Sequence, residues 1–164
     1  MTTTANTRTH TWAPTTTPPA DMSGIDFLRA LLAGRFPPPP IAGTLGFTLV
    51  RVEPGVAVFE GETGEHQYNP LGSIHGGYFA TLLDSALGCA VMSRLPAGRG
   101  YTTTQLNVHM VRPAFVHTGT LRCEATALHV GRTVATAEAR LTAVGDGKLY
   151  AHGTTTCAIF PTAP

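Results

Sequence analysis

Charge is scarce in this 164-residue chain, in which only 13% of the residues are charged and the formal net charge is +1. A nucleic-acid binder carries a basic excess, and a protein held on anionic lipid carries a block of positive charge. Neither feature is present, so we expect no nucleic-acid partner. Residues 1–20 contain no apolar run of the length that a signal peptide or a membrane span needs. We therefore predict a cytoplasmic protein with no membrane partner.

Cysteine is also rare and follows no pattern. The three cysteines, Cys89, Cys123 and Cys157, lie in apolar or strand-like runs without a C-x-x-C pair, and an odd number argues against a disulfide framework. The seven histidines show no spacing typical of metal ligands, and the G-x-S-x-G motif of serine hydrolases is missing. We predict reduced, buried and inert cysteines, no metal, and no Ser-His-Asp chemistry.

The most apolar part of the chain follows a polar, Gly-rich loop. From Gly77 to Val91 apolar residues fall on all sides of a helix, which predicts a helix surrounded by protein. Asp84 lies in this run and is the only acidic residue between Glu65 and Glu124. A buried carboxylate is costly unless it is paired, hydrogen-bonded or used. Asp84 is therefore the first catalytic candidate, although a hydrogen-bonded core aspartate is the structural alternative.

The loop before this helix supplies further candidates. His75, Gly76 and Gly77 open the helix, and the unpaired N–H groups of a helix N-terminus can stabilise a carbonyl oxygen that is becoming an oxyanion. The alternative for the glycine pair is an ordinary tight turn. Asn69 could donate to a substrate carbonyl or orient a water, but an Asn-Pro pair is also a common turn former.

The remaining pattern predicts the fold. A short helix over residues 23–33, with Ser23 as N-cap, precedes a polyproline II link over residues 37–40. Strand-like runs cover residues 41–52, 56–63, 101–111, 121–130, 133–144 and 149–160. One long helix and six strands, mostly joined by hairpins, indicate an α+β domain in which a curved antiparallel sheet wraps the helix. We expect a disordered Thr/Pro-rich tail over residues 1–20, the short helix and linker over 21–40, and the main domain over 41–164.

Several motifs together carry a resemblance to a known family. N-P-x-G-x-x-H-G-G spans residues 69–77, and L-L-D follows at residues 82–84. T-x-x-L-x-V-x-x-V-R-P-A spans residues 103–114, and Gly131-Arg132 and Ala151-His152-Gly153 follow. This combination closely resembles the PaaI-type acyl-CoA thioesterases of the hotdog fold, over about residues 24–160. The resemblance also implies the order of the strands in the sheet.

What the resemblance implies can be stated residue by residue. Asp84 would act as general base or nucleophile. The backbone N–H of Gly76, with Gly77 as a further donor, would polarise the thioester carbonyl, and Asn69 would hold that carbonyl or the attacking water. His75 would shape the loop.

Two more groups of residues follow from the resemblance. Thr103 would orient the carboxylate or the water, although a register shift would turn Thr102 or Thr104 to that face instead, and a threonine chosen for strand propensity is the structural alternative. Arg112, Gly131 and Arg132 would contact the phosphates of CoA, unless the arginines are only solvated turn charges. CoA then enters as part of the acyl-CoA substrate, and no separate cofactor is expected.

Two other functions stay open. A hotdog hydratase or dehydratase would use a histidine paired with an acid to move protons next to the carbonyl, but the proline-rich loop after the catalytic histidine of acyl-carrier-protein dehydratases is missing. A non-catalytic module that only binds acyl-CoA is the second alternative, because a fold does not fix an activity.

Helix geometry argues for a shared site. Gly77 and Asp84 are seven residues apart, so roughly 10 Å separate them along a helix axis, which is too far to serve one carbonyl. Two antiparallel helices related by a two-fold axis would bring each Asp84 to the other subunit's loop. The resembled family is built this way, which implies a homodimer with shared active sites and a dimer of dimers, a homotetramer.

Overall fold

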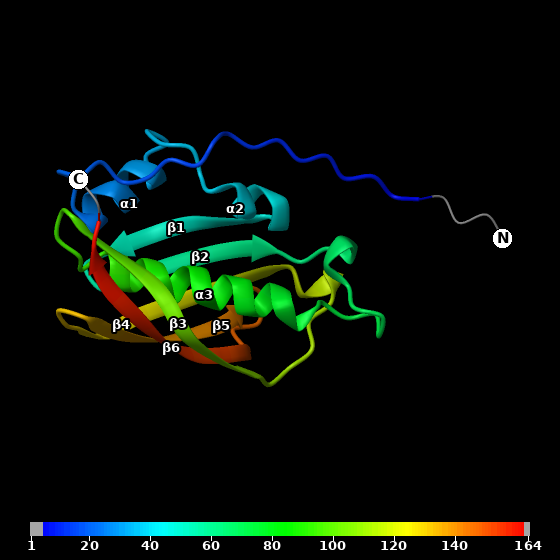
Figure 1. Ribbon diagram of the computed structural model, residues 1–164. Helices are drawn as coiled ribbons and strands as arrows, with labels where there is room; N and C mark the ends of the chain where they lie inside the picture. The colour runs from blue at the N-terminus through cyan, green and yellow to red at the C-terminus, as the bar shows by residue number, and fades with distance from the viewer. Residues whose placement is uncertain (1–4, 163–164) are drawn as a thin grey trace.

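The structure is a computed structural model that describes residues 5–162, so residues 1–4 of the predicted tail lie outside the described part. Residues 5–19 contain neither helix nor strand and run along one side of the domain (Figure 1). Helix α1 (Gly24–Leu32) begins where predicted, because the Ser23 side chain accepts a hydrogen bond from the Asp26 N–H as the N-cap. Phe27 and Leu28 are buried, so α1 packs as part of the domain.

The predicted strand over residues 41–52 is wrong in its first half. A short helix, α2 (Pro40–Leu45), precedes strand β1 (Phe47–Glu53). Pro40 occupies the first position of α2, where a proline lacks no needed N–H and its φ is already helical. Gly46 ends α2 in the left-handed conformation, with φ 75°. Pro39 is extended, with ψ 142°, as the polyproline prediction requires.

The six strands form one antiparallel sheet in the order β1-β2-β4-β5-β6-β3, which confirms the predicted strand number and direction. The other strands are β2 (Val56–Glu62), β3 (Arg99–Met110), β4 (Thr120–Val130), β5 (Val134–Ala143) and β6 (Leu149–Pro161). Strands β4, β5 and β6 are joined by short turns, as expected for a meander. Strands β1 and β3 are therefore the two edges of the sheet.

Helix α3 (Gly76–Met92) fills the curve of the sheet (Figure 1). Leu82, Leu83 and Leu87 are fully buried, and α3 packs against strands β2 to β6. Two short 3-10 helices, η1 (Glu65–Gln67) and η2 (Val116–Thr118), lie in the connections. A curved six-stranded sheet around one central helix is the hotdog fold. Within residues 5–162, no helix combines the length and the apolar composition needed to cross a membrane.

Strand β3 runs antiparallel to α3 and close beside it. A Cβ added at Gly76 would overlap the sulfur of Met110, near the end of β3, and one added at Gly88 would lie 2.5 Å from the Tyr101 hydroxyl, near its start. Glycine at both positions is what allows this close approach. Between these contacts Asp84 on α3 meets Thr103 on β3.

Candidate active site

One face of α3 remains open in the single chain. Gly77 is exposed, and Thr81, Asp84 and Ser85 are partly exposed. Their spacing of three and four residues puts them on one side of the helix. The prediction that protein surrounds this helix on all sides is therefore wrong for one subunit. Asp84, the only acidic residue of α3, lies on this open face.

Asp84 is held by a threonine from β3. The Thr103 Oγ1 hydroxyl donates to Asp84 Oδ1 over 2.9 Å. Thr104 instead donates to the Thr156 carbonyl over 3.0 Å, and the ladder between β3 and β6 shifts register between Thr103 and Gln105. The structure therefore turns Thr103, rather than its neighbour, toward the carboxylate. Within residues 5–162 no side chain donates to the other carboxylate oxygen, Oδ2.

The other titratable side chains near Asp84 are held neutral. Burial, and then the charge of Asp84, raise the pKa of the Cys89 thiol to about 12. Burial also raises the pKa of the Tyr101 phenol well above its ordinary value, with smaller contributions from Cys89, Cys157 and Asp84. Cys123 and Cys157 are buried, whereas Cys89 keeps some exposed surface, and all three are free thiols. At neutral pH the Cys89 thiol and the Tyr101 phenol therefore keep their protons.

Asn69 shapes the loop that precedes α3. Its Oδ1 accepts from the backbone N–H groups of Leu71, at 2.9 Å, and Ser73, at 3.3 Å, while its Nδ2 donates to Ser73 Oγ at 3.0 Å. An amide nitrogen carries two N–H donors, and the described chain takes up one of them. Asn69 thus forms a turn, which was the alternative to a contact with substrate. Its role toward a substrate stays a prediction.

His75 uses one of the two amides that were predicted to hold an oxyanion. As the N-cap of α3, its Nδ1 accepts from the Gly77 N–H over 2.8 Å. The Gly77 amide is therefore occupied, which corrects the expectation of a second free donor. The Gly76 N–H has no acceptor among residues 5–162, so it is the amide that remains for a carbonyl oxygen. His75 shapes this loop, as the resemblance implied.

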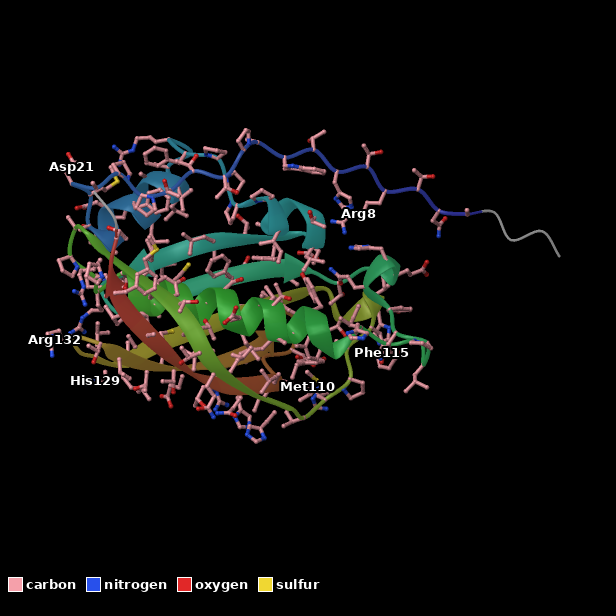
Figure 2. All side chains as sticks on the ribbon, viewed as in Figure 1. Arg8, Asp21, Met110, Phe115, His129 and Arg132 are labelled. Carbon is pink, nitrogen blue, oxygen red and sulfur yellow. The ribbon has the colours of Figure 1, made fainter. Side chains whose placement is uncertain are left out.

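The structure does not bring Arg112 and Arg132 into one site. Arg132 lies at the end of the molecule where β3 starts, because its carbonyl accepts from the Arg99 side chain. Arg112 follows the other end of β3, and roughly 36 Å of strand separates the two ends at ~3.3 Å per residue. Figure 2 shows Arg132 and Met110 far apart along the sheet. Arg112 and Arg132 of one subunit therefore do not meet at one phosphate, and the contact of each arginine with CoA stays a prediction.

The partners of these residues differ as well. Arg112 Nε donates to the Leu149 carbonyl over 3.3 Å, and its guanidinium lies 5.8 Å from the centre of the Tyr150 ring. The Gly131 N–H donates to the Val134 carbonyl over 2.9 Å, so this amide belongs to the hairpin and is not free for a phosphate. The Arg132 side chain is exposed.

A pocket of about 540 Å³ opens beside the loop before α3. His75, Gly77 and Thr81 line it from the loop and the helix, and Arg8 and His10 line it from the N-terminal segment. Sequence reasoning missed the last two residues, because a Thr/Pro-rich tail gives no signal of where it lies on the domain.

Comparison with known proteins identifies the family. The model of the thioesterase superfamily matches residues 71–150, which include the loop, α3 and β3. Mouse acyl-coenzyme A thioesterase 13 is 34% identical over 106 residues, which cover 65% of this chain and 74% of the mouse protein. The chain belongs to the thioesterase superfamily.

Other members of the superfamily agree in sequence and fold. A phenylacetic acid degradation-related protein from Ralstonia eutropha is 32% identical, with a TM-score of 0.73 and coverage of 80% of this chain and 98% of that one. A thioesterase family protein from Silicibacter pomeroyi is 26% identical, with a TM-score of 0.72 and coverage of 82% and 96%. A protein named as an esterase in Halobacterium salinarum is 42% identical over 77 residues, so the match spans about half of that relative, 49%.

Proposed function

We propose that this chain hydrolyses acyl-CoA thioesters to the free acid and CoA. The contact that carries the proposal is the 2.9 Å hydrogen bond from Thr103 Oγ1 to Asp84 Oδ1 at the open face of α3. A carboxylate oriented through one oxygen, with the other free, can take a proton from water or attack a carbonyl carbon. The name of the mouse relative, an acyl-coenzyme A thioesterase, supports the substrate class.

The reaction follows one of two balanced routes. In the first, Asp84 takes a proton from water as the water oxygen bonds to the thioester carbon, the carbon–sulfur bond breaks, and the departing thiolate receives that proton. In the second, the Asp84 carboxylate attacks the thioester carbon and the carbon–sulfur bond breaks, which gives a mixed anhydride and the CoA thiolate. Water then hydrolyses the anhydride to the free acid and the Asp84 carboxylate, and the proton released goes to the thiolate. Both routes place negative charge on the carbonyl oxygen, and the unpaired Gly76 N–H at the start of α3 is the donor that we assign to it.

One subunit cannot supply both groups to one substrate. Gly76 and Asp84 are eight residues apart in one continuous helix, which corresponds to ~12 Å along the axis. The attacking atom has to come within ~3.5 Å of the carbon whose oxygen meets the Gly76 amide. We therefore assign each site to two subunits, with Asp84 from one and the loop from the other.

The edge strand β3 gives this dimer a register. Met110 lies beside Gly76 and Thr103 beside Asp84. If β3 pairs antiparallel with its own copy, Thr103 has to lie opposite Met110 of the partner subunit to bring each Asp84 level with the other loop. Because Thr104 is an extra residue in the ladder of β3, the two-fold axis then passes near Asn107. This register keeps most of β3 paired. The paired part includes Thr103, which lies beside Asp84, and Met110, which lies beside Gly76.

The same dimer gives the exposed Arg132 a role. Arg132 lies near the start of β3, because its carbonyl accepts from the Arg99 side chain. In the dimer that we assign, this end of β3 lies toward the loop of the partner subunit. We assign Arg132 to a phosphate of the CoA bound in that shared site, where a guanidinium can bind phosphate oxygens in pairs. Arg112 uses one of its five N–H donors on the Leu149 carbonyl, and its contact with a phosphate of CoA stays a prediction.

A panel of acyl-CoA thioesters of different acyl size, with release of free thiol followed by a colorimetric reagent, tests the proposal. The expected result is turnover that depends on Asp84. Tight binding of acyl-CoA without thiol release would instead support a binding module. A change in enoyl absorbance without thiol release would support a hydratase.

A further inference from the structure

The pocket beside the loop is lined by an unusual set of side chains. Arg8 and His10 come from the N-terminal segment, His66 from η1, and His75 from the N-cap of α3. Among residues 5–162, no acidic side chain lines this pocket of about 540 Å³. Four basic or titratable nitrogen side chains thus converge from three separate segments. We call this set of Arg8, His10, His66 and His75 the basic pocket.

Arg8 is positioned by the short helix α2. Its Nη1 donates to the Thr44 carbonyl over 3.2 Å, near the end of that helix. Its guanidinium also lies over Gly46, where an added Cβ would come within 2.8 Å of Nη2. A guanidinium carries five N–H donors, and within residues 5–162 only one is used. Arg8 is therefore held by one hydrogen bond, and because its side chain is exposed, its other donors remain available to a ligand.

The basic pocket contrasts with the chain as a whole, in which 11 Lys and Arg residues nearly balance 10 Asp and Glu residues. Burial lowers the pKa of His66, and the charges of Arg8 and His10 lower it further. The contribution of Arg8 and His10 is expected where basic groups lie close together. His75 accepts from Gly77 at Nδ1, so its Nε2 carries the remaining N–H as a donor.

The pocket adjoins the group that we assign to the thioester carbonyl. His75 and Gly77, which line it, flank Gly76 on both sides in the chain. An anionic group within the pocket would therefore belong to the same bound molecule as the carbonyl. Phosphate and carboxylate oxygens are the natural ligands of a guanidinium with free donors.

We propose that the basic pocket binds an anionic oxygen group of the thioester substrate, either a phosphate of CoA or a carboxylate at the far end of the acyl group. The inference rests on the proposed thioesterase function and adds a specificity residue, Arg8, to it. Arg8 and His10 lie outside residues 71–150, which the superfamily model matches, so the contact distinguishes this chain from relatives that share only the central motifs.

Steady-state kinetics of Arg8→Ala and Arg8→Lys test the proposal. Arg29→Ala is the matched control, because Arg29 is exposed on α1 and does not line the pocket. Four substrates are compared: acyl groups with and without a terminal carboxylate, each as the CoA thioester and as the N-acetylcysteamine thioester, which lacks the phosphates. We expect Arg8→Ala to raise KM about tenfold with kcat nearly unchanged, as for loss of a contact remote from the reacting carbonyl.

The pattern of the loss identifies the source of the anion. A KM effect confined to the two CoA thioesters assigns the pocket to phosphate, and one confined to the two carboxylate-bearing acyl groups assigns it to the acyl chain. Arg8→Lys should retain part of the affinity in either case, because it keeps the charge and loses the planar fork. Equal KM values for wild type and Arg8→Ala on all four substrates would overturn the proposal.

Binding can also be measured without turnover. Trp12 is the only tryptophan of the chain and lies two residues from His10, with 66% of its surface exposed. Titration with pyrophosphate and with glutarate should change Trp12 fluorescence saturably for at least one of them, in wild type and Arg29→Ala but not in Arg8→Ala. No saturable change with either anion in wild type would overturn the pocket. Arg8-dependent binding without any thioester hydrolysis would overturn the proposed function and keep the anion site.

Discussion

The two edges of the sheet are built differently. Strand β1 has seven residues, its pairing with β2 shifts register between Leu49 and Arg51, and α1 and α2 pack beside it. Strand β3 has twelve residues, and within residues 5–162 only β6 pairs with it. Leu106 and Val108 are half-buried on β3, and Met110 is 51% exposed.

This difference indicates which edge takes a partner. Open strand edges invite pairing with another chain, and proteins usually shorten, break or cover them. The edge at β1 shows all three devices. The edge at β3 has a register shift of its own between Thr103 and Gln105, but it is twelve residues long, and in the described part of the chain no helix packs on its outer side as α1 and α2 do on β1. It carries Thr103 next to the candidate catalytic carboxylate. An edge left open beside a site that one subunit cannot complete is what a shared active site requires.

The largest expected effect comes from removing the carboxylate on the open side. Asp84→Asn should lower kcat on the best substrate about a hundredfold or more, because neither a general base nor a nucleophile remains. The folded structure should persist, as checked by circular dichroism and thermal unfolding. Turnover close to that of wild type would remove Asp84 from the mechanism.

A second change tests the two edges against each other. The double substitution Gln105→Lys/Asn107→Lys changes two exposed residues near the proposed two-fold axis. It should raise the dissociation constant of the dimer at least tenfold, because like charges would meet across the interface between the two β3 strands. Activity at low protein concentration should fall as a result. Val50→Lys on β1 is the control and should leave the mass in analytical ultracentrifugation unchanged. Dissociation by Val50→Lys alone would reverse the comparison.

A smaller loss is expected from the hydrogen bond to Asp84. Thr103→Val keeps the branched shape and removes the hydroxyl, so kcat should fall about fivefold to tenfold, with unfolding free energy changed by about 1 kcal/mol. Thr104→Val, which removes a hydrogen bond to the Thr156 carbonyl, is the matched control for strand stability. Equal kcat values for the two variants would show that Thr103 does not orient the carboxylate.

A further prediction concerns the reactivity of the Cys89 thiol and its contribution to stability. With its pKa raised to about 12, Cys89 is almost entirely protonated at pH 8, and alkylation should be slower than for an unfolded thiol by about a thousandfold. The stability contributed by this proton is fully present below the unfolded pKa of ~8.5 and is lost as pH rises through about 12. Urea unfolding of wild type and Cys89→Ala across pH 8–11 checks the sign. Rapid labelling of Cys89 in the native protein would contradict it.

Much of the fold could be predicted because periodicity reports which faces are buried. The fully buried leucines of α3 and the alternating strands are visible in the sequence in this way. Helix α2 was missed because a run of prolines reads as extended chain, while the last proline can also begin a helix. The contrast between β1 and β3 was also out of reach, because it depends on which strands end the sheet.

The site shows the same division. The resemblance pointed to Thr103 beside Asp84, which the structure brings together, and to His75 in the loop, but it could not show which amides are free. The Gly77 N–H donates to the His75 side chain, and the Gly131 N–H donates to the Val134 carbonyl across the hairpin. The separation of Arg112 from Arg132 and the position of Arg8 depend on the tertiary structure, and no local sequence pattern indicates them.

The central claim is that Asp84 of one subunit serves the loop of the other, and mixed dimers test it directly. Asn69→Ala removes the side chain that holds the loop, and Asp84→Ala removes the carboxylate, so we expect each protein to be inactive alone. The two are unfolded together and refolded. If the sites are shared, one site of each heterodimer contains both substitutions and the other site contains neither. About half of the dimers are mixed under random pairing, so activity should recover to roughly a quarter of that of wild type in a closed two-fold dimer. No recovery, despite heterodimers confirmed by mass spectrometry, would place Asn69 and Asp84 in a site of one subunit and contradict the account.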